Sequence, residues 1–246
     1  MANFTSFQNV LPDPNNTIDT AGQSGGTVKG PGFKSVSVTS QEPYIQSKTN
    51  SGRILARSIA AHKWSAKITY NPMTREEFEP IHTFLLQRRG PMNPFFVSLP
   101  QYRTPRNSSF EVHCATNNGL DVNNSAGYVA GTTSMLLDGP NYTINADGTP
   151  SIGDMFNILG ANSNHKKAYM VTRVETPDDY LTASGAPAAN NVRVHFVPGL
   201  SRSVVDDDSV VFHNPLIKVI RTGNVEEYSL NTNNLYQFAL NVEEVQ

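Results

Sequence analysis

Residues 34–39 read KSVSVT, and residues 64–70 read WSAKITY. In both stretches polar and apolar side chains alternate, which is the period of a β-strand with one buried face. Between them, residues 47–52 read SKTNSG, a composition typical of turns. The sequence therefore predicts the two strands of a hairpin, with the second strand running without a break from residue 53 to residue 70.

The predicted second strand carries different chemistry on its two faces. Odd positions place four cations on one face: Arg53, Arg57, Lys63 and Lys67. Even positions form an apolar face that consists of Ile54, Ala56, Ala60, Trp64, Ala66, Ile68 and Tyr70. About 18 residues at ~3.3 Å each would span about 60 Å, which is longer than ordinary strands. We therefore expect this strand either to bend or to belong to a larger sheet that several chains build together.

The segment after residue 70 has the pattern of an amphipathic helix. Thr74 is a good N-cap, and Glu77 lies three positions later, which makes a capping box. Apolar side chains then recur at helical spacing up to Leu86, and Gly90 follows the basic last turn. Pro80 lies past the first turn, so we expect it to remove one backbone hydrogen bond and kink the helix.

Strand patterns fill most of the remaining chain. A short apolar strand is predicted at 95–99, and five short strands between residues 134 and 212 suggest a small closed barrel. Strand-like stretches return at 217–220 and 235–242, where the C-terminus would complete the edge of the first sheet. We therefore predict three parts. They are an extended arm at 1–32, a discontinuous β domain at 33–106 and 215–246, and an inserted small β domain at 107–214.

Charge and composition restrict the classes of function. The 246 residues carry 19 Lys+Arg and 21 Asp+Glu, a net charge of 19 − 21 = −2, which excludes a generic polybasic nucleic-acid coat. The balance is uneven, because residues 1–106 carry 12 − 6 = +6 and residues 107–246 carry 7 − 15 = −8. Halves of opposite sign can meet within one chain or between copies, or each can simply face solvent.

Motifs for catalysis, cofactors or metals are not found in the sequence. There is no phosphate-binding Gly-rich loop, no Gly-x-Ser-x-Gly nucleophile elbow and no His-Glu-x-x-His helix. The single cysteine, Cys114, excludes an intrachain disulfide and a multi-cysteine metal site. We expect no enzyme activity, no cofactor and no metal. The N-terminal residues lack a signal-peptide pattern and no apolar run is long enough to span a bilayer, so we expect synthesis in the cytoplasm and no membrane partner.

The order of elements at residues 33–102 resembles a known fold. An amphipathic hairpin, the link YNPMT at 70–74 into a short helix, Arg89-Gly90 closing it, and FFVSLPQY at 95–102 resemble the tail-tube fold of tailed bacteriophages. The likeness is greatest to the tube initiator or distal tail proteins of the baseplate hub. Motifs between residues 131 and 200 resemble the β domain that is often inserted there, so the resemblance covers roughly residues 33–245. It implies a mainly β protein with one short α-helix, in which a tail-tube-like β-barrel or sandwich domain carries an inserted small β-barrel domain.

The resemblance also implies a function in the virion. Such proteins form a ring, usually of six copies, whose hairpins close a continuous β-barrel around a channel that DNA crosses. The ring would join the central hub to the tail tube protein, meet the tape-measure protein, and be assembled in the host cytoplasm into the tail or baseplate. The basic strand face suits a DNA channel poorly, so we expect it to face outward or toward a neighbouring subunit. The residues predicted at the subunit interface are Val36, Val38, Arg53, Arg57, Lys63, Trp64, Lys67 and Ile68.

A second interpretation remains open from the sequence. The inserted β domain could bind carbohydrate or another component of the host surface, with the ring serving as its mount; an exposed aromatic cluster on that domain would favour this function. Contractile and non-contractile tails share the architecture, and the sequence does not distinguish them.

Overall fold

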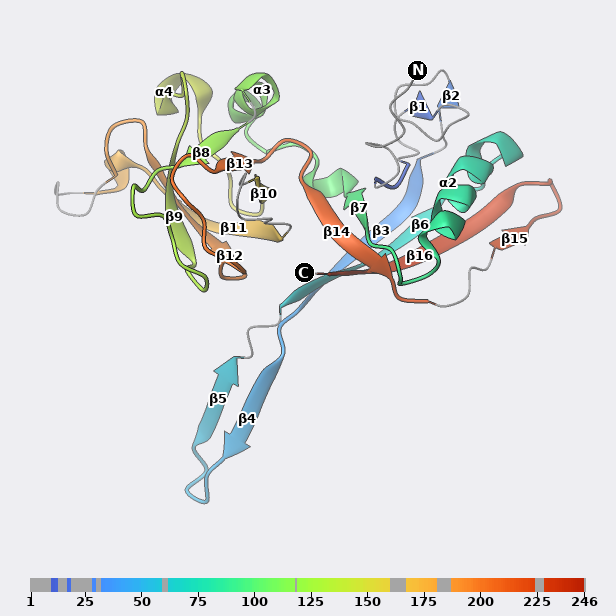
Figure 1. Ribbon diagram of the computed structural model, residues 1–246, viewed down its shortest axis with the longest axis horizontal. Helices are drawn as coiled ribbons and strands as arrows, with labels where there is room; N and C mark the ends of the chain where they lie inside the picture. The colour runs from blue at the N-terminus through green and yellow to red at the C-terminus, as the bar shows by residue number, and fades with distance from the viewer. Residues whose placement is uncertain are drawn as a thin grey trace. The chain divides into compact units, whose positions relative to one another are not determined.

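The computed structural model describes residues 10–12, 17–18, 28–29, 32–58, 62–117, 119–159, 167–180, 187–223 and 228–245 (Figure 1). Its chain divides into two compact units, Met1–Val97 with Lys218–Gln246, here called the sheet unit, and Ser98–Ile217, here called the barrel unit. The sequence placed the corresponding boundaries at 106/107 and 214/215. No helix in the described part of the chain is both long and apolar enough to cross a bilayer.

The sheet unit is built on a largely antiparallel sheet whose strands differ in length. Its strands follow the order β3 (Phe33–Gln41), β6 (Lys63–Tyr70), β16 (Tyr236–Glu244), β14 (Leu216–Arg221) and β7 (Phe95–Ser98), and β15 (Tyr228–Leu230) pairs with β16. The C-terminal strand β16 therefore lies inside the sheet, between β6 and β14, and not at its edge as the sequence pattern suggested. Its alternation of buried and exposed side chains matches that of β6, so both strands bury the same face.

Helix α2 (Arg75–Arg88) covers the apolar face of the sheet (Figure 1). Phe78 stacks on Tyr236 at 4.7 Å between ring centroids and contacts Phe238 edge-on at 5.9 Å. Ile81 and Leu85 are buried on the same side, as helical spacing requires, but Leu86 is 55% exposed and is not part of the predicted apolar stripe.

Both ends of α2 are defined by local interactions. Thr74 is the N-cap, and its backbone N–H donates to the Glu77 carboxylate at 2.7 Å. Arg89 adopts the left-handed conformation at the C-cap (φ 54°), and its N–H donates to the carbonyl of Leu86 at 3.1 Å. The helix continues across Pro80, and the Thr83 hydroxyl donates to the Glu79 carbonyl nearby.

The single long strand predicted over residues 53–70 is wrong. Two strands occupy this stretch: β5 (Ile54–Ser58), which pairs with β4 (Tyr44–Lys48) in a separate two-stranded sheet, and β6, which lies between β3 and β16. The physical reason is a difference in burial. Strand β6 packs under α2, whereas the described side chains of β4 and β5 are all exposed. Ala60 of the predicted apolar face lies outside the described residues.

Little of the predicted N-terminal arm is described. Thr17–Ile18 (β1) pairs with Val28–Lys29 (β2). Nearer the start, the N–H of Leu11 donates to the carbonyl of Phe96 at 2.8 Å, and Leu11 is 4% exposed. Residues 10–12 are therefore packed on strand β7 as part of the sheet unit.

The barrel unit contains a closed six-stranded barrel, which confirms the prediction of a small barrel (Figure 1). Around the barrel the strands follow the order β10 (Met155–Leu159), β11 (Ala168–Glu175), β12 (Val192–Val197), β9 (Ser134–Asp138), β8 (Leu120–Val122) and β13 (Ser209–Val211). Its core is aromatic: Phe156 contacts Tyr169, Phe196 and Phe212 with ring centroids 5.1–5.5 Å apart. The mainly β fold is thus confirmed.

Two helices and one strand of the barrel unit were not predicted from the sequence. Helix α3 (Ser108–Asn117) and the one-turn α4 (Ile144–Asp147) bring the described α-helices to three, where one was predicted. The short 3-10 turns Pro100–Tyr102 (η1) and Pro177–Asp179 (η2) complete the elements. Strand β8 has three residues, too few to display a period.

Candidate functional site

Among the described residues of the sheet unit, the face of β3, β6 and β16 opposite the core is largely exposed. Across β3, β6 and β16 the register places Ser37 beside Lys67 and Lys67 beside Asn241, and all three side chains are exposed. The same parity applies along the strands, because successive side chains point to opposite faces. We call this surface the polar face; it consists of Ser35, Ser37, Thr39, Gln41, Lys63, Ser65, Lys67, Thr69, Ala239, Asn241 and Glu243.

The charges of the polar face nearly cancel. Lys63 Nζ lies 2.5 Å from Glu243 Oε1, with the two side chains 47% and 29% exposed. Such a partly exposed pair adds about 0–1 kcal/mol to stability, but the carboxylate of Glu243 cancels the positive charge of Lys63. With Lys67, the polar face carries 2 − 1 = +1. Hydroxyl and amide groups make up most of the rest.

The predicted interface residues do not form one surface. Lys63 and Lys67 lie on the polar face, whereas Trp64 and Ile68 are 6% and 0% exposed and belong to the core of the sheet unit. Val36 and Val38 are half-buried on the same side as that core, and Arg53 and Arg57 belong to the β4–β5 hairpin. Trp64 and Ile68 are therefore corrected to core residues, because the helix side of the sheet, and not a neighbouring subunit, buries them.

Strand β3 forms an edge of the sheet. Its nine residues pair with β6 from Phe33 to Gln41, and within the described residues no strand pairs with its other side. Every second residue of such a strand directs its N–H and C=O away from the sheet. The register shifts between Phe33 and Ser35, and the regular part of the edge runs from Ser35 to Gln41. An unpaired edge of this length is a template for pairing with another chain, which proteins normally block with prolines, bulges or short strands.

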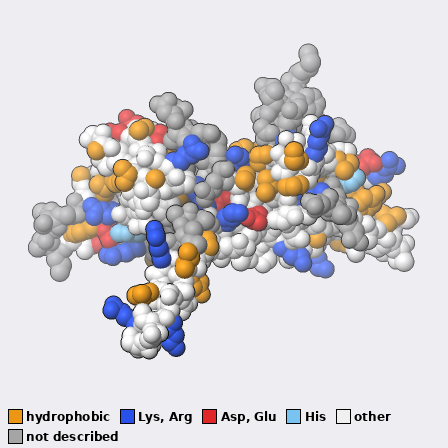
Figure 2. All heavy atoms as spheres, turned by 60° about the horizontal axis from the view of Figure 1, so that its bottom comes forward, with side chains coloured by type: hydrophobic (Ala, Val, Ile, Leu, Met, Phe, Trp, Pro, Cys, Tyr) orange, Lys and Arg blue, Asp and Glu red, His pale blue; other side chains and the backbone are white. Residues whose placement is uncertain are grey.

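The hairpin of β4 and β5 exposes apolar and basic side chains together (Figure 2). Its turn is well fixed, since the Thr49 N–H donates to the Arg53 carbonyl at 2.9 Å and Gly52 has φ 83°. Large apolar side chains on the strands are more than half exposed: Tyr44, Ile45, Ile54 and Leu55. A two-stranded hairpin with no covered face is only marginally stable in water, so this surface is suited to a partner.

Two comparisons with known proteins bear on these surfaces: one matches residues 11–102, and the other covers 74% of the chain. A profile of the family described as "Distal tail protein pb9, A domain, N-terminal" matches residues 11–102, which run from the segment packed on β7 through the hairpin, β6, α2 and β7 to η1. The chain is also 26% identical over 194 residues to "Distal tail protein pb9" of Escherichia phage T5, covering 74% of this chain and 83% of that protein.

The chain is similar to phage distal tail proteins. It has a structural role in the phage tail, is located in the tail of the virion, and acts with tail-associated partners and in oligomers. The resemblance inferred from residues 33–102 is thereby confirmed. The family match begins at Leu11 and not at the hairpin, in agreement with the contact between Leu11 and Phe96.

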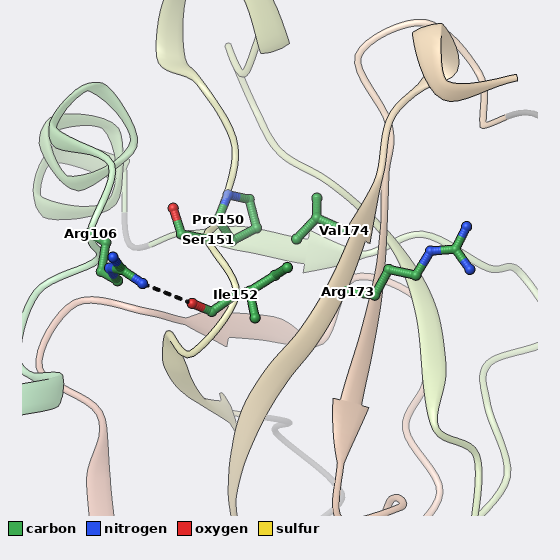
Figure 3. A pocket seen from close by; sticks show the side chains of 6 residues that line it. All are labelled: Arg106, Pro150, Ser151, Ile152, Arg173 and Val174. Carbon is green, nitrogen blue, oxygen red and sulfur yellow. Dashed lines mark hydrogen bonds between the residues drawn. The ribbon is translucent and has the colours of Figure 1, made fainter.

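The barrel unit contains a shallow hollow of about 470 Å³ (Figure 3). Its lining residues are Arg106, Pro150, Ser151, Ile152, Arg173 and Val174. Both arginines are already engaged: Arg106 Nη1 donates to the Ile152 carbonyl at 3.4 Å, and Arg173 Nη2 lies 2.9 Å from Glu175 Oε1. In Figure 3 the guanidinium group of Arg106 points toward Ile152, whereas that of Arg173 points away from it, so the two do not converge on a common point.

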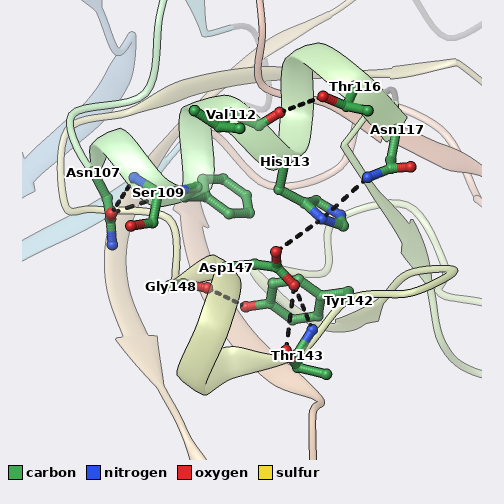
Figure 4. A network of polar contacts seen from close by, with 11 residues as sticks. Asn107, Ser109, Val112, His113, Thr116, Asn117, Tyr142, Thr143, Asp147 and Gly148 are labelled. Carbon is green, nitrogen blue, oxygen red and sulfur yellow. Dashed lines mark hydrogen bonds and ion pairs between the residues drawn. The ribbon is translucent and has the colours of Figure 1, made fainter.

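A second polar cluster joins helices α3 and α4 (Figure 4). His113 Nδ1 lies 3.6 Å from Asp147 Oδ1, and the other oxygen of Asp147 accepts the Thr143 N–H at 2.7 Å. The Tyr142 hydroxyl donates to the Gly148 carbonyl at 2.7 Å. These contacts tie the two helices together. Nearby, burial raises the pKa of the Cys114 thiol to about 12, so the thiol stays protonated and is a poor nucleophile at neutral pH.

The described residues contain no group of His, Cys, Asp or Glu side chains arranged to hold a metal ion. Asp206, Asp207 and Asp208, the acidic run seen in the sequence, separate in the structure. Asp208 is buried and accepts the Val205 N–H at 2.9 Å, while Asp206 and Asp207 face solvent. These three residues thus form a turn, in which Asp207 adopts the left-handed conformation (φ 63°).

A buried carboxylate on the barrel makes stability depend on pH. The hydroxyl of Tyr180 donates to Glu175, and this hydrogen bond, aided by His195 and Arg173, holds the pKa of Glu175 below its usual value. A lowered folded-state pKa stabilises the protein above the unfolded pKa of about 4.3, and the stabilisation is lost as pH falls through the folded pKa.

Tyr180→Phe removes the main cause of that shift. We expect the variant to be less stable than the wild type at pH 7, with a deficit in unfolding free energy that shrinks as the pH falls below about 4. Urea unfolding of the barrel unit, followed by near-UV circular dichroism of the full chain across this pH range, measures the difference. A deficit that stays constant down to pH 3 would show that Glu175 is not its source.

Proposed function

We propose that this distal tail protein assembles into a closed ring, of six copies as the resemblance implies, that joins the hub of the tail to the tail tube and encloses the channel for DNA. The role is structural and not catalytic. The observation that carries the proposal is the outer edge of β3, a nine-residue strand paired on one side only among the described residues. Edges of this kind disappear when copies join edge to edge in a circle.

The polar face supports a position toward the channel. Its cations, which the sequence grouped on one long strand, are divided by the structure: Arg53 and Arg57 lie on the hairpin, and Lys63 is neutralised by Glu243. The remaining surface is rich in hydroxyl and amide groups with a charge of +1. Affinity for DNA comes mainly from neutralising phosphates with several cations, so such a lining would let DNA pass without holding it.

The partners follow from this arrangement. A ring between hub and tube has two rims, which would contact the baseplate hub protein and the tail tube protein, and its channel would meet the tape-measure protein. Assembly would take place in the host cytoplasm. None of these contacts requires a cofactor or a metal.

The competing function, carbohydrate or host-surface binding by the barrel unit, lacks the feature that would favour it. Stacking on sugars uses exposed aromatic rings, but the large apolar side chains that are more than half exposed among the described residues of the barrel unit are aliphatic: Val112, Val129, Ile152, Leu159 and Val205. We therefore favour the ring over carbohydrate or host-surface binding as the function of this protein.

The mass of the purified full-length chain tests the ring. Native mass spectrometry at tens of micromolar is expected to give one closed oligomer, and negative-stain images are expected to show a central hole. A chain that stays monomeric throughout that concentration range, alone and with its tail neighbours, would overturn the proposal.

A further inference from the structure

The β4–β5 hairpin has two faces with different chemistry. The register pairs Ile45 with Arg57 and Ser47 with Leu55, so these four side chains share one face, and Arg53 extends it by the next residue of the same parity. Ile45 and Leu55 are 61% and 52% exposed. We call Ile45, Leu55, Arg53 and Arg57 the arginine face: two apolar side chains flanked by two guanidinium groups.

The barrel unit has a surface of the opposite character. The register places Asp121 opposite Asp138 on neighbouring strands. Burial, and then the charges of Asp121, Asp207 and Asp206, raise the pKa of Asp138. Their hydrogen bonds come from neutral donors, namely Ser209 Oγ to Asp121, Asn123 Nδ2 to Asp138 and the Asn124 N–H to Asp206. We call these four residues the acidic cluster.

An apolar side chain adjoins the acidic cluster. Val205 precedes Asp206 directly and is 53% exposed. The acidic cluster with Val205 therefore offers carboxylates around an aliphatic contact, and the arginine face offers guanidinium groups around aliphatic contacts. Arginine and carboxylate pair with bidentate geometry, and complementary charge sets orientation and partner choice.

We propose that the arginine face of one copy docks on the acidic cluster of the next copy in the ring. The inference rests on the proposed ring and assigns it a second contact besides the β3 edge. Two different surfaces meet in this contact, so it is head-to-tail and repeats from copy to copy in one direction. Closure of the ring gives every hairpin a partner.

Charge reversal with complementation tests the contact. One variant carries Arg53→Glu and Arg57→Glu, and a second carries Asp121→Lys and Asp206→Lys. Each alone is expected to raise the dissociation constant for self-assembly at least tenfold at physiological salt. An equimolar mixture is expected to recover assembly, because in an alternating ring each reversed hairpin meets a reversed cluster and each native hairpin meets a native cluster.

Controls separate folding from docking. Lys48→Glu reverses a charge on the opposite face of the hairpin, and Asp178→Arg reverses an exposed acid elsewhere on the barrel unit; both are expected to assemble like the wild type. Circular dichroism melts check that each variant folds. If the lysine variant is unfolded, Asp206→Asn with Asp207→Asn removes the charges with little change of shape and is expected to weaken assembly severalfold.

The outcomes distinguish this contact from the ring itself. A wild-type chain that never assembles removes the proposed function and this inference with it. Assembly of the wild type that neither reversal weakens leaves the ring standing and overturns the docking contact. Reversals that weaken assembly singly without recovery in the mixture overturn it as well, since the contact would then lie within one chain or with another tail protein.

Discussion

Phe78→Ala is expected to lower the free energy of unfolding of the sheet unit by about 3–5 kcal/mol. The ring of Phe78 is 2% exposed and stacks on Tyr236, with Phe238 and Tyr228 within 6 Å between centroids. Its removal leaves a cavity between α2 and β16 that the rigid sheet cannot close. Trp64 is the sole tryptophan and is buried in the same unit, so its fluorescence in urea titrations reports on this unit directly.

Leu86→Ala is the matched control on the same helix. Leu86 is 55% exposed, so its truncation removes little buried area and is expected to cost about 0.5 kcal/mol or less. Equal losses for Phe78 and Leu86 would mean that α2 does not pack on the sheet through Phe78.

Proline in strand β3 is expected to abolish assembly at one position and damage the fold at the next. Neighbouring residues of an edge strand direct their N–H groups alternately toward the sheet and away from it. Of Val38→Pro and Thr39→Pro, one variant therefore loses a bond to β6, while the other loses only a bond to a neighbouring copy. Loss of that bond and the clash of the proline ring weaken each contact about tenfold or more, and a closed ring needs every contact.

The informative variant is the one that keeps its melting temperature. It is expected to sediment as a monomer under conditions where the wild type forms its oligomer. Lys218→Ala, on a strand in the interior of the sheet, serves as a control that leaves the β3 edge intact. If the folded proline variant still assembles like the wild type, β3 does not pair between copies.

The sequence predicted most of the fold wherever a full period of side chains was present. The alternation predicted in 64–70 and 235–242, the capping box at Thr74 and Glu77, and the strands near 155, 168 and 192 all reappear. Strand β8 and the one-turn α4 are shorter than one readable period. Helix α3 follows directly on Asn107, whose side-chain oxygen accepts the Ser109 N–H. The helix sequence SSFEVHCATN has too few apolar positions to show a stripe.

The candidate interface was harder to predict than the fold. Parity correctly separated Lys63 and Lys67 from Trp64 and Ile68, but parity alone does not tell whether an apolar face is covered by the chain's own helix or by a neighbour. The same rule placed Arg53 and Arg57 on the face of Lys67, because no local pattern indicates that β5 leaves the sheet of β6. The pairing of Lys63 with Glu243 joins residues 180 positions apart, which no local pattern reveals.

Cryo-electron microscopy of the intact phage tail tests the central claim most directly, at a resolution that traces main chains. The account predicts that the outer edge of β3 in each copy makes a ladder of backbone hydrogen bonds with a strand of the adjacent identical copy, all the way around the channel. A map in which that edge faces solvent, or is covered by a protein of different sequence, would contradict it.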